Sequence, residues 1–394
     1  MSSRLGLYIH SRKHIFAISF SRLSDALGGG AVYFALPLFI AGINPTSIPN
    51  AFLSGVIIAV WGIVATIVQP VIGLAIDRTG RAKLLLFLGL LATSMVLYTY
   101  TRVEDLLALL SVRVALGFTE AVVMVSSIVI LASVSERRKR GENFGIFYTV
   151  TDIGFALSPV LAGILLEYYG FSEVFIAGAA LTLMSAALVL RLVPEVEISS
   201  LNDGKREKPS REILMISTTL FFTICALSAY VPLEESFLSY MSLTPLTFGI
   251  TYSAYIITRT FFNAPAGRLS DRMGRKRIFV AGTVVLGIST IAVPLCQNFL
   301  QFLILRVFQG VVVAFIYSPA TALVADKSEH NLGLGMSVTN SALTLGLALG
   351  PIFAGFLGGY IGFFAPFYFF GLSIVLSGFL SAIKVSEEFK FEIE

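Results

Sequence analysis

The sequence GLAIDRTGRAK at residues 73–83 has a similar second copy in the chain, and this repeat indicates the architecture. Its second copy is GRLSDRMGRKR at residues 267–277, and every matched position lies 194 residues further along the chain. Each copy is a short charged segment between two long apolar runs. The repeat therefore predicts a chain that is built from two copies of one unit.

Two further pairs of segments support the duplication. RVALG at 113–117 returns as RVFQG at 306–310, which is 193 residues later. GFALSPVLAG at 154–163 returns as GLALGPIFAG at 346–355, which is 192 residues later. Three signatures in the same order at nearly one offset indicate a duplicated unit of six membrane spans.

The composition identifies the protein class. Of 394 residues, 56% are hydrophobic and only 13% are charged, and the mean hydropathy is +0.85. Soluble domains carry about 25% charged residues, and a membrane-spanning helix needs about 20 apolar ones. The apolar segments are continuous, whereas the strands of a membrane barrel alternate. We therefore expect an all-α integral membrane protein with twelve spans, near 15–40, 51–75, 83–101, 106–134, 143–166, 173–193, 213–237, 246–268, 278–296, 299–325, 334–358 and 364–383.

The loops between the spans predict the topology. Basic clusters such as 137–140 and 268–277 alternate with uncharged segments such as 41–50 and 238–245. Basic loops stay cytoplasmic, which predicts a multi-pass protein of the cell membrane with both termini in the cytoplasm.

One hydrophilic stretch, 194–211, lies at the middle of the chain. Its polar composition is typical of a flexible linker, although an amphipathic helix on the membrane surface is an alternative. The predicted organisation is a six-helix bundle at 1–193, a cytoplasmic linker at 194–211 and a second bundle at 212–394.

The pattern GxxxDRxGRxK after span two resembles the signature loop of the major facilitator superfamily, and its second copy strengthens the match. The resemblance covers the whole chain. It implies two pseudo-symmetric six-helix bundles around a central cavity, which transport a small molecule by rocking alternating access. It also implies a monomer in the lipid bilayer with protons as a partner, and no enzyme activity, cofactor, metal or nucleic acid. The chain lacks a GxxxxGK phosphate loop, so we do not expect it to hydrolyse ATP.

In this family the repeated loop acts as a conformational latch on the cytoplasmic side. The glycines would let helix backbones approach closely, and the carboxylates would pair with arginines or helix N-termini. An alternative is that the basic residues only set the topology. The predicted latch residues are Gly73, Asp77, Arg78, Gly80, Arg81, Gly267, Asp271, Arg272, Gly274 and Arg275.

Three carboxylates reach mid-membrane depth in the first half, in the order of preference Asp25, Glu120 and Asp152. A central charge is costly in a span, about 2.5–3.5 kcal/mol on insertion scales, and marks a functional candidate. No histidine lies in a span, so carboxylates would carry any coupled proton. The alternative is a permanent ion pair, which Arg22 could form with Asp25 because the two are three residues apart on one helical face.

Arg113 is the fourth candidate for proton coupling. Burial disfavours a charged carboxylate and a nearby arginine favours it, so an arginine that moves relative to a carboxylate would load and release a proton. In related proton-coupled exporters the span-four arginine has this role, and Arg113 matches its position. Its repeat partner, Arg306, is interpreted as structural.

Arg259 lies inside span eight, and its repeat position holds Ala65. It could bind an anionic substrate group, pair with a first-half carboxylate or extend to the membrane surface. The candidate residues of the substrate cavity are Arg22, Arg259, Asn263 and Tyr33. Glu234 and Glu235 are expected to be solvated residues at the outer mouth.

The span-five segment at 154–163 resembles the motif of drug/proton antiporters, which has glycine at positions 158 and 162, where this chain has Ser158 and Ala162. Small residues here would let spans five and eight pack tightly; generic small-residue packing is the alternative. The predicted packing motif is Gly154, Ser158, Pro159, Gly163, Gly350 and Pro351.

These features favour proton-coupled efflux, that is antiport, of amphipathic or drug-like small molecules. One alternative is proton-linked or facilitated transport of a small organic anion, with Arg259 and Arg113 as the anion clamp. A second is a non-transporting membrane receptor on the same fold.

Overall fold

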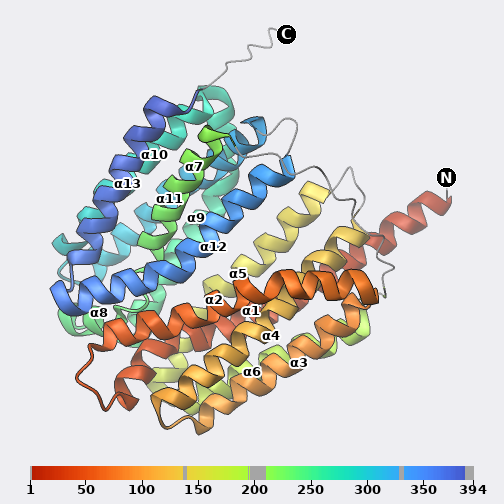
Figure 1. The fold of residues 1–394 in the computed structure, drawn as a ribbon, viewed down its shortest axis with the longest axis horizontal. Helices are drawn as coiled ribbons and strands as arrows, with labels where there is room; N and C mark the ends of the chain where they lie inside the picture. Colours follow the sequence, from red (N-terminus) through yellow and green to blue (C-terminus); the bar gives the residue numbers. More distant parts are fainter. Residues whose placement is uncertain (1, 136–139, 194, 196–209, 328–331, 387–394) are drawn as a thin grey trace. The chain divides into compact units, whose positions relative to one another are not determined.

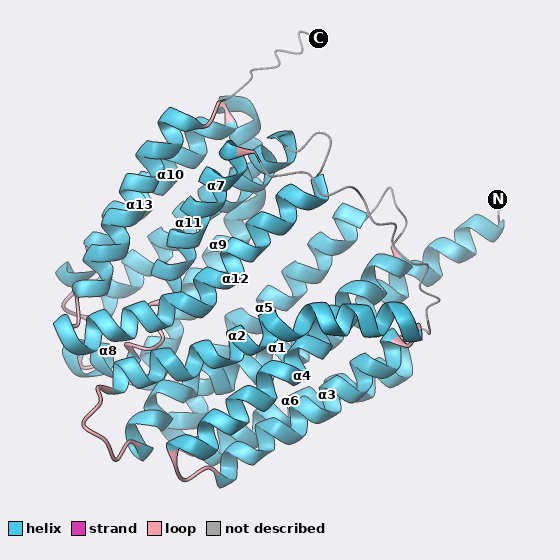
Figure 2. Ribbon diagram, in the orientation of Figure 1, coloured by secondary structure: helices cyan, strands magenta, loops and turns pink. Residues whose placement is uncertain are grey.

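The computed structural model describes residues 2–135, 140–193, 195, 210–327 and 332–386. Within these ranges the side chains of 2–13, 77, 140–142, 332–334 and 337 lie outside the description. Figure 2 shows that the described part consists of helices and connecting loops, without a strand.

Six long helices form the first half of the chain, and each lies at a predicted span. They are α1 (Ser2–Ile43), α2 (Asn50–Thr79), α3 (Ala82–Thr99), α4 (Leu106–Val134), α5 (Arg140–Tyr168) and α6 (Phe171–Leu192). The turn η1 (Tyr100–Arg102) follows α3. The Asp105 carboxylate accepts a hydrogen bond of 2.7 Å from the backbone N–H of Ala108 and so begins α4.

The second half repeats this order with one difference. Its helices are α7 (Arg211–Ser228), α8 (Glu234–Met241), α9 (Pro245–Met273), α10 (Arg275–Ile291), α11 (Phe299–Lys327), α12 (Leu332–Phe356) and α13 (Ala365–Lys384), with the short elements η3 (Val293–Leu295) and η4 (Leu357–Ile361).

The expectation of one continuous span at 213–237 was wrong. The helix stops at Ser228, a turn occupies 229–233, and α8 begins at Glu234. Pro232 lies within this turn and favours the break, because proline has no N–H to donate and its ring clashes with the preceding turn of a helix.

Ten of the described helices are long and apolar enough to cross a membrane. The two further long helices are α10, which has 17 residues, and α9, which carries several polar side chains. With these two, the protein has the twelve membrane-spanning helices that hydropathy predicts.

The described residues form two compact units. The first holds most of α1–α6 together with residues 244–253, which include the start of α9. The second holds the remaining helices together with residues 46–59, which include the start of α2. Residues 194 and 196–209 of the predicted linker lie outside the described residues, so the predicted boundary at 194–211 stays a prediction.

Helix packing follows the same pattern in both units. In the first, α1 packs against α5 and α6, and α3 packs against α4 and α6. In the second, the matching helix α7 packs against α12 and α13, and α10 packs against α11 and α13. The labels in Figure 1 allow these pairs to be followed within each unit. The sequence repeat is therefore also a repeat of structure.

Candidate functional site

A buried ion pair lies on α1. Arg22 and Asp25 are three residues apart, which places them on one helical face, and Arg22 Nη1 donates a hydrogen bond to Asp25 Oδ2. Their side chains are only 7% and 2% exposed. The Thr182 hydroxyl of α6 also faces Asp25. The pairing that we considered as the alternative role for Asp25 is thus present in the structure.

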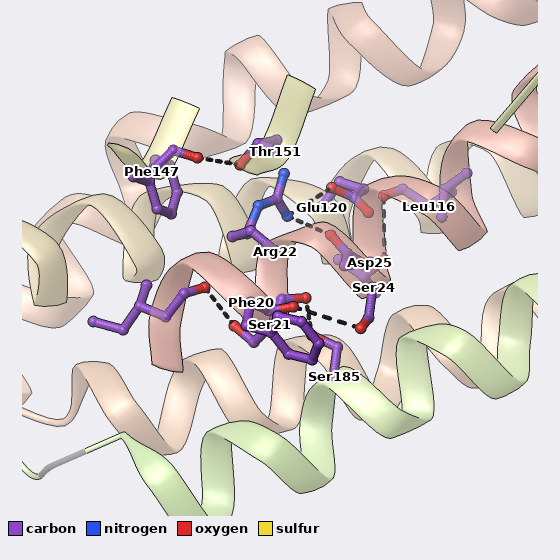
Figure 3. A network of polar contacts seen from close by, with 12 residues as sticks. Phe20, Ser21, Arg22, Ser24, Asp25, Leu116, Glu120, Phe147, Thr151 and Ser185 are labelled. Carbon is purple, nitrogen blue, oxygen red and sulfur yellow. Dashed lines mark hydrogen bonds and ion pairs between the residues drawn. The ribbon is translucent and has the colours of Figure 1, made fainter. Parts of the chain in front are cut away.

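Glu120 of α4 is the third charged residue of this site. Its Oε2 atom lies 4.0 Å from Arg22 Nη1, and its side chain is 16% exposed. Figure 3 shows the Arg22 guanidinium directed toward both carboxylates. We call Arg22, Asp25 and Glu120 the charged cluster. One arginine serves two carboxylates here, so the cluster has one negative charge in excess when both are ionised.

Helix packing holds the cluster in place. Ser185 of α6 donates a hydrogen bond of 2.6 Å to the backbone oxygen of Ser21 on α1. A Cβ atom on Gly154 of α5 would lie 2.6 Å from the backbone oxygen of Leu23, so α5 approaches α1 within one residue of Arg22. The residues next to the cluster are therefore fixed from two sides.

The second unit provides an internal comparison. A Cβ on Gly346 would lie 2.8 Å from the backbone oxygen of Phe221, which matches the Gly154–Leu23 contact and aligns α7 with α1 at an offset of 198 residues. At this offset the positions of Arg22 and Asp25 hold Leu220 and Thr223. At the offset of 193 residues that relates α11 to α4, the position of Glu120 holds Val313, and all three residues are buried. The same helix packing forms without the charges, so packing does not require the charged cluster.

The structure places Arg113 in a different environment. Its guanidinium lies 6.0 Å from the centre of the Trp61 ring on α2, and a Cβ on Gly117 would lie 2.7 Å from the Trp61 backbone oxygen. The arginine that contacts the two carboxylates is Arg22, and the coupling role of Arg113 stays a prediction.

Arg306 repeats this arrangement in the second unit. Its guanidinium lies 4.4 Å from the centre of the Tyr255 ring, and a Cβ on Gly310 would lie 2.6 Å from the Tyr255 backbone oxygen. Tyr255 and Trp61 are 194 residues apart. The motif Arg-x-x-x-Gly thus docks one helix on an aromatic residue of its neighbour in both units, which agrees with the structural interpretation of Arg306.

The other candidates belong to both units. Asp152, Tyr33, Arg259 and Asn263 are each half-buried. Asp152 and Tyr33 belong to the first unit, whereas Arg259 and Asn263 belong to the second. Arg259 lies 5.9 Å from the centre of the Tyr255 ring. The substrate-cavity role of these residues stays a prediction.

The expectation for Glu234 was wrong. Its side chain is buried, with 2% exposure, whereas Glu235 is exposed as predicted and accepts a hydrogen bond of 2.9 Å from Asn50 Nδ2. The turn at 229–233 directs Glu234 inward, and hydropathy gives no sign of that turn.

The second copy of the latch loop forms an ion network. Arg275 contacts Asp271 at 2.9 Å and Asp326 of α11 at 2.7 Å. Sequence analysis missed Asp326, because it lies 51 residues from Arg275 along the chain. Arg272 is exposed.

In the first copy, Arg78 and Arg81 are exposed, and the side chain of Asp77 lies outside the described residues. Gly80 and Gly274 adopt φ values of +66° and +101°, which suit glycine.

The glycines that open the two loops do not have the predicted contacts. A Cβ on Gly73 would meet no described atom within 4 Å, and a Cβ on Gly267 would meet the Ser318 side chain at 2.8 Å. Within the described part of the chain, neither glycine therefore lies at a close contact between two helix backbones.

The span-five motif lies at close contacts. Gly154 faces α1, and a Cβ on Gly163 would lie 2.5 Å from Leu246 Cα of α9, which belongs to the same unit. Pro159 O faces Gly249 of α9. In the second unit Gly350 faces Ser228, and Pro351 O faces Gly55. Small residues thus stand where helices approach closely, and their part in transport stays a prediction.

Comparison with known proteins identifies the family. The family model described as Major Facilitator Superfamily matches residues 18–242 and 216–390. An uncharacterized MFS-type transporter of Methanocaldococcus jannaschii is 32% identical over 185 residues, which are 47% of each chain, so the match spans about half of that relative. A multi-drug resistance efflux pump PmrA homolog of Lactococcus lactis is 24% identical over 357 residues, which are 87% of each chain.

A solved structure shares the fold. A bacterial homolog of the human lysosomal transporter Spinster, in an inward-facing and unoccupied conformation, superposes with a TM-score of 0.72 over 95% of both chains at 14% identity. Since the family model matches nearly the whole chain and the described helices follow the twelve-helix architecture, this protein belongs to the Major Facilitator Superfamily.

Proposed function

We propose that the protein exports amphipathic or drug-like small molecules in exchange for protons, by alternating access, across a cell membrane in which both termini face the cytoplasm. The observation that carries the proposal is the charged cluster, in which Arg22 contacts Asp25 and Glu120. Buried ionic groups inside membrane spans are rare and mark ion pathways.

Within the cluster, Glu120 is suited to exchange the proton. Asp25 is fixed by its hydrogen bond from Arg22, whereas Glu120 stands at 4.0 Å and is the more exposed of the two carboxylates. When Glu120 binds a proton, Arg22 and Asp25 remain as a neutral pair. When Glu120 releases it, the cluster carries a net negative charge that attracts a cationic substrate.

The second unit supports a functional role for these charges. Leu220, Thr223 and Val313 occupy the matching positions without loss of the packing pattern. A charge that the shared architecture does not need, and that costs free energy in a membrane, is retained for another reason. Proton exchange is the chemistry that such a cluster can perform.

The direction of transport and the class of substrate are inferred from a relative and from a sequence motif. The Lactococcus lactis relative is named an efflux pump for multiple drugs, and the segment at 154–163 resembles an antiporter motif. Transport of an organic anion is the second candidate, because Arg259 is a cation in only one half of the repeat.

Reconstituted vesicles test this function, with ethidium as the probe cation. An imposed pH gradient should drive ethidium accumulation, and Glu120→Gln should abolish the accumulation while the protein remains folded. Glu167→Gln is a matched control, because Glu167 is exposed at the end of α5. Accumulation by Glu120→Gln at the rate of the unsubstituted protein would contradict the proposal. Movement of organic anions that is lost in Arg259→Ala would favour the second candidate.

A further inference from the structure

Glu234 is a buried carboxylate that the charged cluster does not involve. It is the first residue of α8, directly after the break in span seven, and it is 2% exposed. Its Oε2 atom has no hydrogen-bond partner, and no ion pair within the described residues includes it. A lone ionised carboxylate is very unfavourable in such surroundings, so this group either holds a proton or pairs with another cation.

Buried apolar side chains lie beside Glu234. Phe237, one turn further along α8, packs against Phe302 of α11 at 4.9 Å and against Phe367 of α13 at 5.6 Å between ring centres. Leu233 and Phe237 are both fully buried. An organic cation would need a cavity between these side chains, whereas a proton needs none.

The charged and titratable groups on the neighbouring elements have their own interactions. Arg306 of α11 lies 4.1 Å from the centre of the Tyr230 ring and donates a hydrogen bond of 3.1 Å to Gln309 Oε1. The Tyr230 hydroxyl donates to the same oxygen at 3.0 Å. Cys296 lies near Tyr230, and Glu235 points to the exposed side. Among the described residues, these bonds join Arg306 and Tyr230 to Gln309 and not to Glu234 Oε2.

The repeat shows that Glu234 is not needed for the shared fold. At the offset of 198 residues its counterpart is Leu36, which is fully buried in the uninterrupted helix α1. Both the carboxylate and the helix break thus belong to the second half alone. Interrupted helices in membrane transporters place polar groups at ion and substrate sites.

We propose that Glu234 is a second proton-binding group, separate from the charged cluster, which gives the transport cycle a second exchangeable proton. This inference rests on the proposed proton coupling. In the described conformation the carboxylic acid holds its proton away from water. When the second unit exposes this region, the O–H bond breaks, the proton passes to water, and the carboxylate remains.

Infrared difference spectroscopy of the lipid-reconstituted protein tests the proton directly and needs no transport. Raising the pH should remove the C=O stretching band of a protonated carboxyl group that is absent from Glu234→Gln and retained in Glu235→Gln. Glu234→Leu introduces the residue that the first half has at the matching position, Leu36, and this variant should therefore fold. The same band should be absent from its spectrum. An identical spectrum in Glu234→Gln and the unsubstituted protein would overturn the assignment.

Simultaneous recording of ethidium and proton movement in vesicles tests the second step. Glu234→Gln should lower the protons moved per ethidium to about half, because only the proton of Glu120, the one that exchanges directly with the bound cation, is then left, whereas Glu235→Gln should leave the ratio unchanged. An unchanged ratio in Glu234→Gln, with coupling intact, would overturn the inference alone. If neither the unsubstituted protein nor any variant moves protons with ethidium, the proposed function fails. The infrared band still decides whether Glu234 holds a proton.

Discussion

Arg22 of α1 lies 4.0 Å from Glu120 of α4 while it donates a hydrogen bond to Asp25 on its own helix. The two carboxylates therefore depend on the same guanidinium to different degrees. Asp25 is held within its helix, and Glu120 belongs to another helix at the limit of an ion pair. A relative movement of α1 and α4 would change the Arg22–Glu120 distance and leave the Arg22–Asp25 pair intact.

The two carboxylates should therefore differ in their effect on stability. Asp25→Asn leaves Arg22 buried without its ionised partner, and breaking a buried pair costs about 3–5 kcal/mol. Glu120→Gln removes the more distant and more exposed charge and should cost less, about 1 kcal/mol. Thermal unfolding in detergent measures both, and equal losses of stability would contradict this division of roles.

Alanine substitutions at two glycines should distinguish the effect of close packing on stability from the effect of helix propensity. A Cβ on Gly117 would meet the Trp61 backbone oxygen at 2.7 Å, whereas a Cβ on Gly145 would meet no described atom within 4 Å. Gly117→Ala should destabilise the protein by about 1–3 kcal/mol through overpacking. Gly145→Ala should stabilise it by about 0.5–1 kcal/mol, because alanine favours a helix. The difference in unfolding temperature between the two variants is the measurement, and a shift in the same direction for both would contradict it.

The Arg275–Asp326 pair should contribute little to stability. The two side chains are 32% and 54% exposed, and exposed ion pairs contribute about 0.2–1 kcal/mol. A double-mutant cycle with Arg275→Ala and Asp326→Asn measures the coupling free energy from unfolding. If the loop is a latch, the same variants should alter the cytoplasmic accessibility of single cysteines more than they alter stability. A strong loss of stability with unchanged accessibility would instead assign the pair a structural role.

Much of the architecture could be predicted from the sequence, because twelve apolar runs and a repeat leave few alternatives. The predicted span at 106–134 coincides with α4. Hydropathy averages over many residues, however, and so it did not show the break before Glu234, where Pro232 interrupts the helix.

The candidate site could be predicted only in part. Sequence spacing predicted the Arg22–Asp25 pair, since both residues lie on one helix. The proximity of Glu120 depends on how α1 packs against α4, which no local pattern encodes. The position of Arg113 near the Trp61 ring likewise depends on how α4 packs against α2, and its coupling role stays a prediction.

The most direct test exchanges the charged cluster for its counterpart in the other unit. The variant Arg22→Leu, Asp25→Thr, Glu120→Val carries the residues found at Leu220, Thr223 and Val313, and replacing buried ion pairs by apolar groups is often neutral or stabilising. We expect this variant to fold and still to exchange ethidium across vesicles at equal pH, but no longer to accumulate ethidium when a pH gradient is imposed. Accumulation driven by the gradient at the rate of the unsubstituted protein would contradict it.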